Sequence, residues 1–167
     1  MRLFIAIRFS REILDSLLRA QEQLRRSGAR GNFSAPENLH LTLAFIGESS
    51  DTVTLRRVID RAAGEAFPLA ISGMGRFGDL WWAGVEKNPA LELLAERLRS
   101  GCRAAGFRID EKPFRAHVTL ARELRSDVPP RVNLPRTEMT VTRVSLMKSE
   151  RIGGKLTYTE VYGRELG

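Results

Sequence analysis

The only two histidines of this 167-residue chain occur in two copies of one tetrapeptide, His-x-Thr-Leu. The first copy is HLTL at residues 40–43, and the second is HVTL at residues 117–120. Because side chains alternate across a strand, the histidine and threonine of each copy are predicted to share one face. The leucine face would join a core, whereas the His/Thr face is costly to bury without polar partners. We therefore expect each pair to line a polar cavity.

Two imidazoles and two hydroxyls that face one cavity suit a phosphate group. Threonine hydroxyls can donate hydrogen bonds to its non-bridging oxygens. A neutral imidazole can accept the proton of an attacking hydroxyl or water, and an imidazolium can donate a proton to the leaving oxygen. Because the ordinary histidine pKa is ~6.5, histidine serves both steps near neutral pH. This chemistry needs no metal ion.

Two other interpretations compete with catalysis. A single histidine on a strand is more often structural, but two histidines in the same tetrapeptide favour a shared function. A metal site is the rival chemistry, yet the chain has one cysteine, Cys102, and no close His-x-His or Cys-x-x-Cys spacing. The sequence also lacks a phosphate-binding P-loop and a Gly-rich dinucleotide fingerprint. We therefore expect neither a metal nor a cofactor.

The chain contains an internal repeat with a constant shift of 77 residues, which is 117 minus 40. Besides the two tetrapeptides, the shift aligns Leu3 with Leu80, Phe4 with Trp81, Ala6 with Ala83, Leu14 with Leu91 and Leu17 with Leu94. Each half reads as a strand, a helix and a His-x-Thr strand. A repeat of this kind predicts two similar lobes facing each other across a cleft, within one domain spanning residues 1–167. Two unrelated strands of similar composition are the alternative.

Strands and helices alternate along the chain, which predicts the α+β class. Helices are expected from Ser10 to about Gly28, from Asp51 to about Gly64, and from Asn88 to Gly106, each between a capping residue and a glycine. The first helix has one polar interruption, Gln21, on its apolar face. Strands are expected at residues 2–7, 39–47, 67–73, 80–85, 114–122, 138–148 and 155–162, with an exposed basic loop at 125–136.

Charge and cysteine content indicate the partners and the compartment. The net charge is +7 and the pI is about 10.4, so an anionic partner is favoured, with nucleic acid ahead of a membrane surface. General solubility is the alternative explanation of the charge. Cys102 is alone and is expected to be buried in a helix, which fits a reducing compartment. Without a signal peptide or a membrane-length apolar run, we predict a cytoplasmic monomer that does not act at a membrane.

Paired His-x-Thr motifs in a duplicated chain of this size resemble the 2H phosphoesterase superfamily. Within it, the sequence is most similar to the bacterial RNA 2′,3′-cyclic phosphodiesterases, historically called 2′-5′ RNA ligases. The resemblance runs nearly end to end, through MRLFIAI, PENLHLTLAFIGE at 36–48, FRAHVTLARE at 114–123, VSLMKSE and GKLTYTEVY. It implies a bilobal α+β fold with two antiparallel sheets around a central cleft. Ala116 departs from the family, which often has proline before the second histidine.

The resemblance also implies roles for individual residues. His40 and His117 would be the catalytic pair, and Thr42 and Thr119 would hold the phosphate. The reaction would open the 2′,3′-cyclic phosphate of an RNA end to a 2′-phosphomonoester. His40 would be the proton donor to the departing 3′ oxygen and His117 the proton acceptor from water, roles that two near-equivalent motifs do not assign by themselves.

Arg122 matches an arginine that is usual after the second motif of the family. A phosphate contact is attractive for it, but strict alternation places Arg122 on the face opposite His117. Arg122 therefore needs a bulge or a strand end to reach the cleft. A surface position is the alternative.

Other substrates and other contacts stay open at this stage. Related enzymes act on 2′-5′ linkages or small cyclic phosphates, and some join RNA ends, while a basic RNA-binding module without a reaction is the alternative from another class. Candidates for stacking on a terminal base are Phe45, Phe114, Trp81 and Trp82, although such residues are more often core. Candidate contacts to the RNA backbone are Arg25, Arg26 and Arg30 on one side and Arg125, Arg131 and Arg136 on the other, with solvated charge as the alternative.

Overall fold

The computed structural model describes residues 1–127 and 129–167. Its helices are α1 (Arg11–Arg26), α2 (Thr52–Ala62), α3 (Pro89–Ala104) and the short 3-10 helix η1 (Pro36–Asn38). Its strands are β1 (Arg2–Ile7), β2 (Arg30–Phe33), β3 (Leu41–Glu48), β4 (Phe67–Phe77), β5 (Leu80–Val85), β6 (His117–Arg125), β7 (Thr137–Val141), β8 (Arg143–Ile152) and β9 (Lys155–Glu165).

The strands form two antiparallel sheets, with the orders β3-β1-β8-β9 and β2-β6-β5-β4-β7. The predicted α+β class with two antiparallel sheets is therefore confirmed. The repeat relates β1 and β3 to β5 and β6, and each of these pairs lies side by side in its own sheet. This correspondence supports two similar lobes within residues 1–167, and that division stays a prediction.

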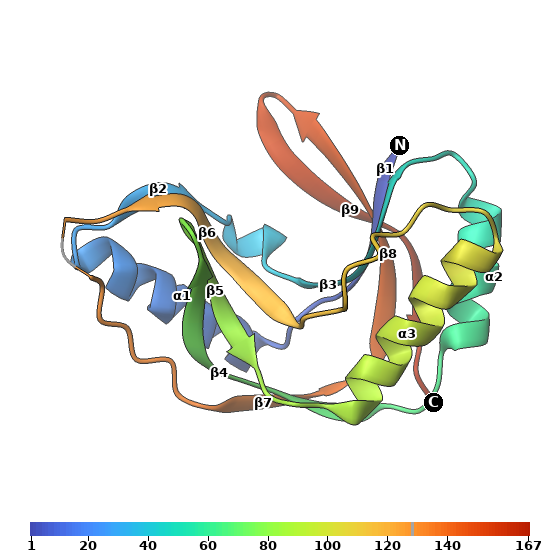
Figure 1. Ribbon diagram of the computed structural model, residues 1–167, viewed down its shortest axis with the longest axis horizontal. Coiled ribbons are helices and arrows are strands. Elements are labelled where there is room, and N and C mark those ends of the chain that lie inside the picture. Colours follow the sequence, from blue (N-terminus) through green and yellow to red (C-terminus); the bar gives the residue numbers. More distant parts are fainter. Residues whose placement is uncertain (128) are drawn as a thin grey trace.

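The helices of the repeat tie the two sheets together (Figure 1). Helix α1 follows β1 of one sheet but contacts β6 and β7 of the other. Helix α3 follows β5 yet contacts β3 of the opposite sheet as well as β4, and it packs beside α2. One buried cluster accordingly contains residues of both sheets, among them Ile5 and Val118. Burial of this shared apolar surface fixes the two motif strands relative to each other.

Each of the three α-helices begins where the sequence predicts. The side chains of Ser10, Asp51 and Asn88 accept hydrogen bonds from backbone N–H groups three residues later, at 3.4, 3.1 and 3.1 Å. These bonds satisfy donors that the first helical turn leaves free. Cys102 is fully buried in α3, as expected, and burial raises the pKa of its thiol to about 11. None of the described helices is long and apolar enough to cross a membrane.

The structure differs from the sequence prediction at five strands, β2, β4, β6, β7 and β8. Strand β2 was not predicted, because its sequence RGNF has little apolar alternation and forms an exposed edge. The single strand expected over 138–148 is two strands that belong to different sheets and meet at Thr142. Strand β4 continues to Phe77 as one arm of a hairpin with β5, and β6 begins at His117 rather than at residue 114.

Candidate active site

Both motif strands carry a β-bulge at the leucine of the tetrapeptide. The register between β1 and β3 skips Leu43, and the register between β5 and β6 skips Leu120. An extra residue shifts the alternation of a strand by one position. In β6 both Leu120 and Ala121 are therefore buried, and Arg122 returns to the face of Thr119. Without a bulge, Arg122 would lie on the face opposite His117, so this bulge brings Arg122 to the cleft.

A cavity of about 510 Å³ lies between the two motif strands. The five residues predicted to bind or react with the phosphate all line it, namely His40, Thr42, His117, Thr119 and Arg122. The other lining residues are Asn32, Phe33, Ser34, Ala35, Asn38, Arg151, Lys155, Leu156 and Tyr158. The lining thus offers imidazole, hydroxyl, amide, ammonium and guanidinium groups, and it holds no carboxylate among the described residues.

The His40 imidazole is held at both nitrogens. Its Nδ1 lies 2.7 Å from the backbone oxygen of Asn38, and its Nε2 lies 2.7 Å from Oγ1 of Thr42. Because a carbonyl can only accept, Nδ1 carries a proton, and in the neutral ring Nε2 accepts from the Thr42 hydroxyl. The rings of Phe4 and Tyr158 pack against the imidazole, with centroids 4.9 and 5.2 Å away.

This enclosure affects the protonation of His40. Burial lowers its pKa below the ordinary value, the hydrogen bond to the Asn38 carbonyl raises it, and the charges of Arg122 and His117 lower it further. The neutral imidazole is therefore favoured in the free protein. Burial also raises the pKa of the neighbouring Tyr158 phenol, which keeps that group protonated.

The His117 imidazole is anchored in the same way as that of His40. Its Nδ1 lies 2.8 Å from the backbone oxygen of Arg115, two residues earlier, as Asn38 is for His40. Both rings are thus protonated at Nδ1, so Nε2, which in His40 contacts Oγ1 of Thr42, is the nitrogen that can exchange a proton. The aromatic neighbour of His117 is Phe77, whose ring stands edge-on with its centroid 5.6 Å away.

The polar interruption of the first helix supports the second motif. Gln21 is fully buried in α1, and its Nε2 donates to the backbone oxygens of Ser34 and Leu120, at 2.9 and 3.0 Å. The Ser34 hydroxyl in turn donates to the backbone oxygen of Thr119, at 3.0 Å. Two of these carbonyls, those of Thr119 and Leu120, lie at the bulge of β6, where the ladder is disrupted.

A second bulge in β6 lies opposite Gly31 of β2. Asn32 pairs with Arg122 and Arg30 pairs with Arg125, so Gly31 faces two residues of β6. One of these, Glu123, has a φ of 53°, a left-handed conformation that is uncommon outside glycine. A Cβ at Gly31 would lie 2.9 Å from the backbone oxygen of Arg122, so glycine permits the close approach of the strands.

The hairpin of β8 and β9 closes one side of the cavity, which the sequence analysis did not anticipate. Arg151, Lys155 and Tyr158 come from this hairpin, which projects beyond the rest of the molecule in Figure 1. Lys155 pairs with Glu37 at 2.8 Å, and Asn38 Nδ2 donates to the backbone oxygen of Leu156 at 3.0 Å. The signal in the sequence was the basic stretch RIGGK at 151–155, which lies between the last two predicted strands.

The aromatic residues proposed for base stacking lie outside the lining of this cavity. They are Phe45, Phe114, Trp81 and Trp82. Phe33 of the unpredicted strand β2 lines the cavity instead, and the Arg25 guanidinium covers its ring at 4.3 Å from the centroid. Phe33 was not predicted as a site residue, because strand β2 was not predicted either.

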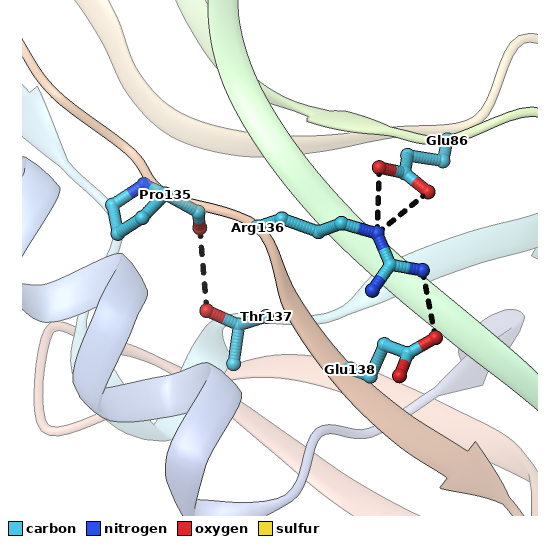
Figure 2. Close-up of polar contacts among 5 residues, drawn as sticks. All are labelled: Glu86, Pro135, Arg136, Thr137 and Glu138. Carbon is cyan, nitrogen blue, oxygen red and sulfur yellow. Dashed lines mark hydrogen bonds and ion pairs between the residues drawn. The ribbon is translucent and has the colours of Figure 1, made fainter.

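Several of the proposed RNA-backbone contacts are engaged within the protein. The Arg136 guanidinium lies between the carboxylates of Glu86 and Glu138, at 2.9 and 2.7 Å (Figure 2). Arg26 pairs with Glu22 at 3.3 Å. These carboxylates offset the positive charge that a nucleic acid would otherwise meet, which favours the solvated-surface interpretation for Arg26 and Arg136.

The sequence matches the model of a known protein family. The family model of the 2′-5′ RNA ligase superfamily matches residues 13–153. This chain belongs to the 2′-5′ RNA ligase superfamily. The family named in the sequence analysis is thereby confirmed.

Relatives of known activity cover most of the chain. The RNA 2′,3′-cyclic phosphodiesterase of Escherichia coli is 32% identical over 166 residues, which cover 95% of this chain and 92% of that protein. The enzyme of the same name from Methanothermobacter thermautotrophicus is 30% identical over 178 aligned positions, covering 96% of each. The relative from Geobacillus stearothermophilus is longer, and its 29% identical match covers 43% of it. These relatives confirm the predicted enzyme class, RNA 2′,3′-cyclic phosphodiesterase.

Solved structures show the same fold. Escherichia coli LigT complexed with 3′-AMP superposes with a TM-score of 0.83 at 29% identity, covering 99% of this chain and 97% of that chain. TT0787 of Thermus thermophilus superposes with a TM-score of 0.81 at 31% identity, covering 99% and 98%. The arrangement of two sheets around the paired motifs is therefore that of the family.

Proposed function

We propose that this chain hydrolyses the 2′,3′-cyclic phosphate at an RNA end to a 2′-phosphomonoester, with His40 and His117 as its acid and base. The observation that carries the proposal is that both His-x-Thr pairs and Arg122 line one cavity. RNA as the substrate also fits the net charge of +7.

The phosphate is held by the two threonine hydroxyls and the Arg122 guanidinium. Thr119 and Thr42 can donate to non-bridging oxygens, and the guanidinium adds charge-assisted hydrogen bonds. Protonation of His40 couples to this binding. When Nε2 of His40 becomes a donor to Oγ1 of Thr42, the Thr42 hydroxyl no longer donates to the ring and is free to donate to the phosphate.

The chemical step transfers one proton at each imidazole. Nε2 of neutral His117 accepts a proton from water as the water oxygen bonds to phosphorus. The bond between phosphorus and the 3′ oxygen breaks, and its electron pair stays on that oxygen. The Nε2 proton of the His40 imidazolium then passes from its hydrogen bond with Thr42 to the departing oxygen. The product is a 2′-phosphomonoester with a free 3′ hydroxyl. Proton exchange with solvent then restores both imidazoles.

The lowered pKa of His40 bears on this assignment, because an acid must be protonated before it can donate. In the free protein, burial and the charge of Arg122 oppose protonation of His40. A bound cyclic phosphate carries a negative charge that favours the imidazolium and offsets Arg122. Substrate binding is therefore expected to raise the pKa of His40 and prepare it as the acid.

The test is product analysis without metal. A short RNA ending in a 2′,3′-cyclic phosphate is incubated with the purified protein in EDTA, and the terminal phosphate of the product is located by NMR. A 2′-phosphomonoester is expected at an undiminished rate. A 3′-phosphomonoester would show that the other oxygen leaves, and abolition of turnover by EDTA would contradict the metal-free mechanism.

A further inference from the structure

The side chain of Asn38 lies beside the first motif and has no role in the mechanism above. Asn38 ends the 3-10 helix η1, lines the catalytic cavity and is 8% exposed. Its backbone oxygen accepts the Nδ1 proton of His40, and its side-chain Nδ2 donates to the backbone oxygen of Leu156 in β9, at 2.7 and 3.0 Å. One buried residue thus joins the imidazole of His40 to strand β9.

The other polar atom of the Asn38 side chain is left without a partner. Its Oδ1 is buried and has no hydrogen bond within residues 1–127 and 129–167. A buried acceptor without a donor costs free energy, and an apolar side chain at this place would avoid that cost. Proteins break this rule mostly at functional sites. A buried amide next to His40 therefore points to a role in the site.

The second motif differs at the equivalent residue. The repeat aligns Asn38 with Arg115, which lies 77 residues later, and the backbone oxygen of Arg115 accepts from Nδ1 of His117 in the same way. Arg115 is exposed, whereas Asn38 is buried. The carbonyl that orients His40 is thus fixed by a buried side chain, and the one that orients His117 belongs to an exposed residue.

Strand β9 also supplies one of the rings that enclose His40. Tyr158 follows two residues after Leu156, and its ring meets the imidazole edge-on, with 5.2 Å between the centroids and 88° between the planes. The hydrogen bond from Asn38 to Leu156 fixes η1 against this part of β9. A shift of η1 would therefore move the carbonyl at Nδ1 relative to the Tyr158 ring.

We propose that Asn38 is the positioning residue of the acid His40, because its carboxamide fixes η1 to β9 and so sets the carbonyl that orients the imidazole. The inference rests on the proposed function and extends it to a residue that acts through His40 rather than on the substrate. A misplaced acid slows proton transfer but does not weaken phosphate binding. Loss of the carboxamide should therefore lower kcat and leave KM nearly unchanged.

The experiment compares Asn38→Ala with the wild type on two substrates that differ in one atom. These are an RNA ending in a 2′,3′-cyclic phosphate and its analogue with sulfur as the 3′ bridging atom. A thiol has a pKa of about 8.5, so a thiolate leaves without an acid. For the oxygen substrate we expect kcat to fall about tenfold, which corresponds to the loss of one hydrogen bond. The sulfur substrate should show no such loss.

Imidazole NMR provides a second measurement that does not depend on turnover. Burial lowers the pKa of His40, and the hydrogen bond to the Asn38 carbonyl opposes this by raising it. When the carbonyl is no longer held in place, His40 should titrate at lower pH, with the titration of His117 unchanged. If Asn38→Ala does not fold, Asn38→Ser, which keeps a hydroxyl donor, is measured with the same expectations.

The control is Asn88→Ala, which removes a similar bond far from the motifs. The Nδ2 of Asn88 donates to the backbone oxygen of Pro68 at 2.7 Å, and its Oδ1 caps α3. This variant should unfold at a lower temperature with kcat and both histidine titrations unchanged.

Three results for Asn38→Ala would overturn the inference. They are a wild-type kcat on the oxygen substrate, an equal loss on the oxygen and sulfur substrates, and equal shifts of the His40 and His117 titrations. The second result would mean that Asn38 supports the fold and not the acid in particular. A wild-type protein that turns over neither substrate would overturn the proposed function itself, and the inference with it.

Discussion

The two His-x-Thr motifs have the same sequence pattern but different surroundings. In both, Nδ1 of the histidine is held by the carbonyl two residues earlier, so the tautomer is the same. His40 is enclosed by Phe4, by Tyr158 and by the hairpin of β8 and β9, whereas His117 stands beside an exposed phenylalanine. The repeat thus gives the two histidines the same hydrogen bond at Nδ1. Their neighbouring residues differ, so the two imidazoles have different environments, as separate acid and base roles require.

The largest effect is expected from removing either imidazole. His40→Ala and His117→Ala should each lower kcat by about 10²- to 10⁴-fold, because in the proposed mechanism each ring transfers a proton in the transition state. Thermal unfolding should show that both variants remain folded. The double variant should be little worse than either single variant, because the two residues act as a unit. Wild-type turnover by either single variant would show that one motif is dispensable.

Replacement of Arg122 tests how its positive charge affects phosphate binding and the pKa of His40. Arg122→Gln should lower kcat/KM about 10- to 100-fold, because a charge-assisted hydrogen bond to phosphate contributes about 1.5–3 kcal/mol. It should also raise the pKa of His40, since the charge of Arg122 lowers it. With two histidines in the chain, imidazole NMR resolves both titrations. An unchanged His40 titration would mean that Arg122 does not act on that ring.

The pH dependence of kcat and kcat/KM tests the lowered pKa of His40. The acid must be protonated, and burial lowers the pKa of His40 in the free protein, so kcat/KM should fall as pH rises through that lowered value. Bound phosphate raises the pKa, so the alkaline limb of kcat should lie at higher pH than that of kcat/KM. Rate profiles at low and at saturating substrate measure both limbs. Coincident alkaline limbs would contradict this account of His40.

A smaller effect, confined to the second motif, is expected at the buried amide of α1. Gln21→Leu leaves the Ser34 carbonyl without its donor, which should cost about 1–3 kcal/mol of unfolding free energy. Urea unfolding measures the loss, and NMR should show that the His117 resonance shifts more than that of His40. Gln23→Leu on the exposed side of the same helix is the matched control. Equal shifts of both histidines would mean that Gln21 does not support the second motif in particular.

The smallest effect is expected at the hairpin. Lys155→Met removes the exposed ion pair with Glu37, and pairs of this kind contribute about 0–1 kcal/mol. We expect a KM increase of a few fold and a small shift of the His40 resonance, with His117 unchanged. Lys148→Met is a control, because Lys148 pairs with Glu150 and does not line the cavity. A larger response of His117 than of His40 would contradict the assignment of this hairpin to the first motif.

The sequence predicted the repeated elements well because their signals are local. Caps such as Ser10 and Asn88 and the apolar periodicity depend on a few adjacent residues. The placement of Arg122 and the role of Gln21 depend on a bulge at Leu120, which is visible only when β5 and β6 pair. The hairpin that carries Lys155 reaches the first motif from the far end of the chain, and no local pattern encodes that contact.

The most direct test of the central claim uses a substrate whose 3′ leaving oxygen is replaced by sulfur. A thiolate leaves without an acid, so His40→Ala should recover most of its lost turnover on this substrate, while His117→Ala should stay inactive because water still needs a base. Recovery by His117→Ala instead would reverse the two roles. Equal impairment of both variants on the oxygen and sulfur substrates would contradict the claim that the two motifs divide acid and base between them.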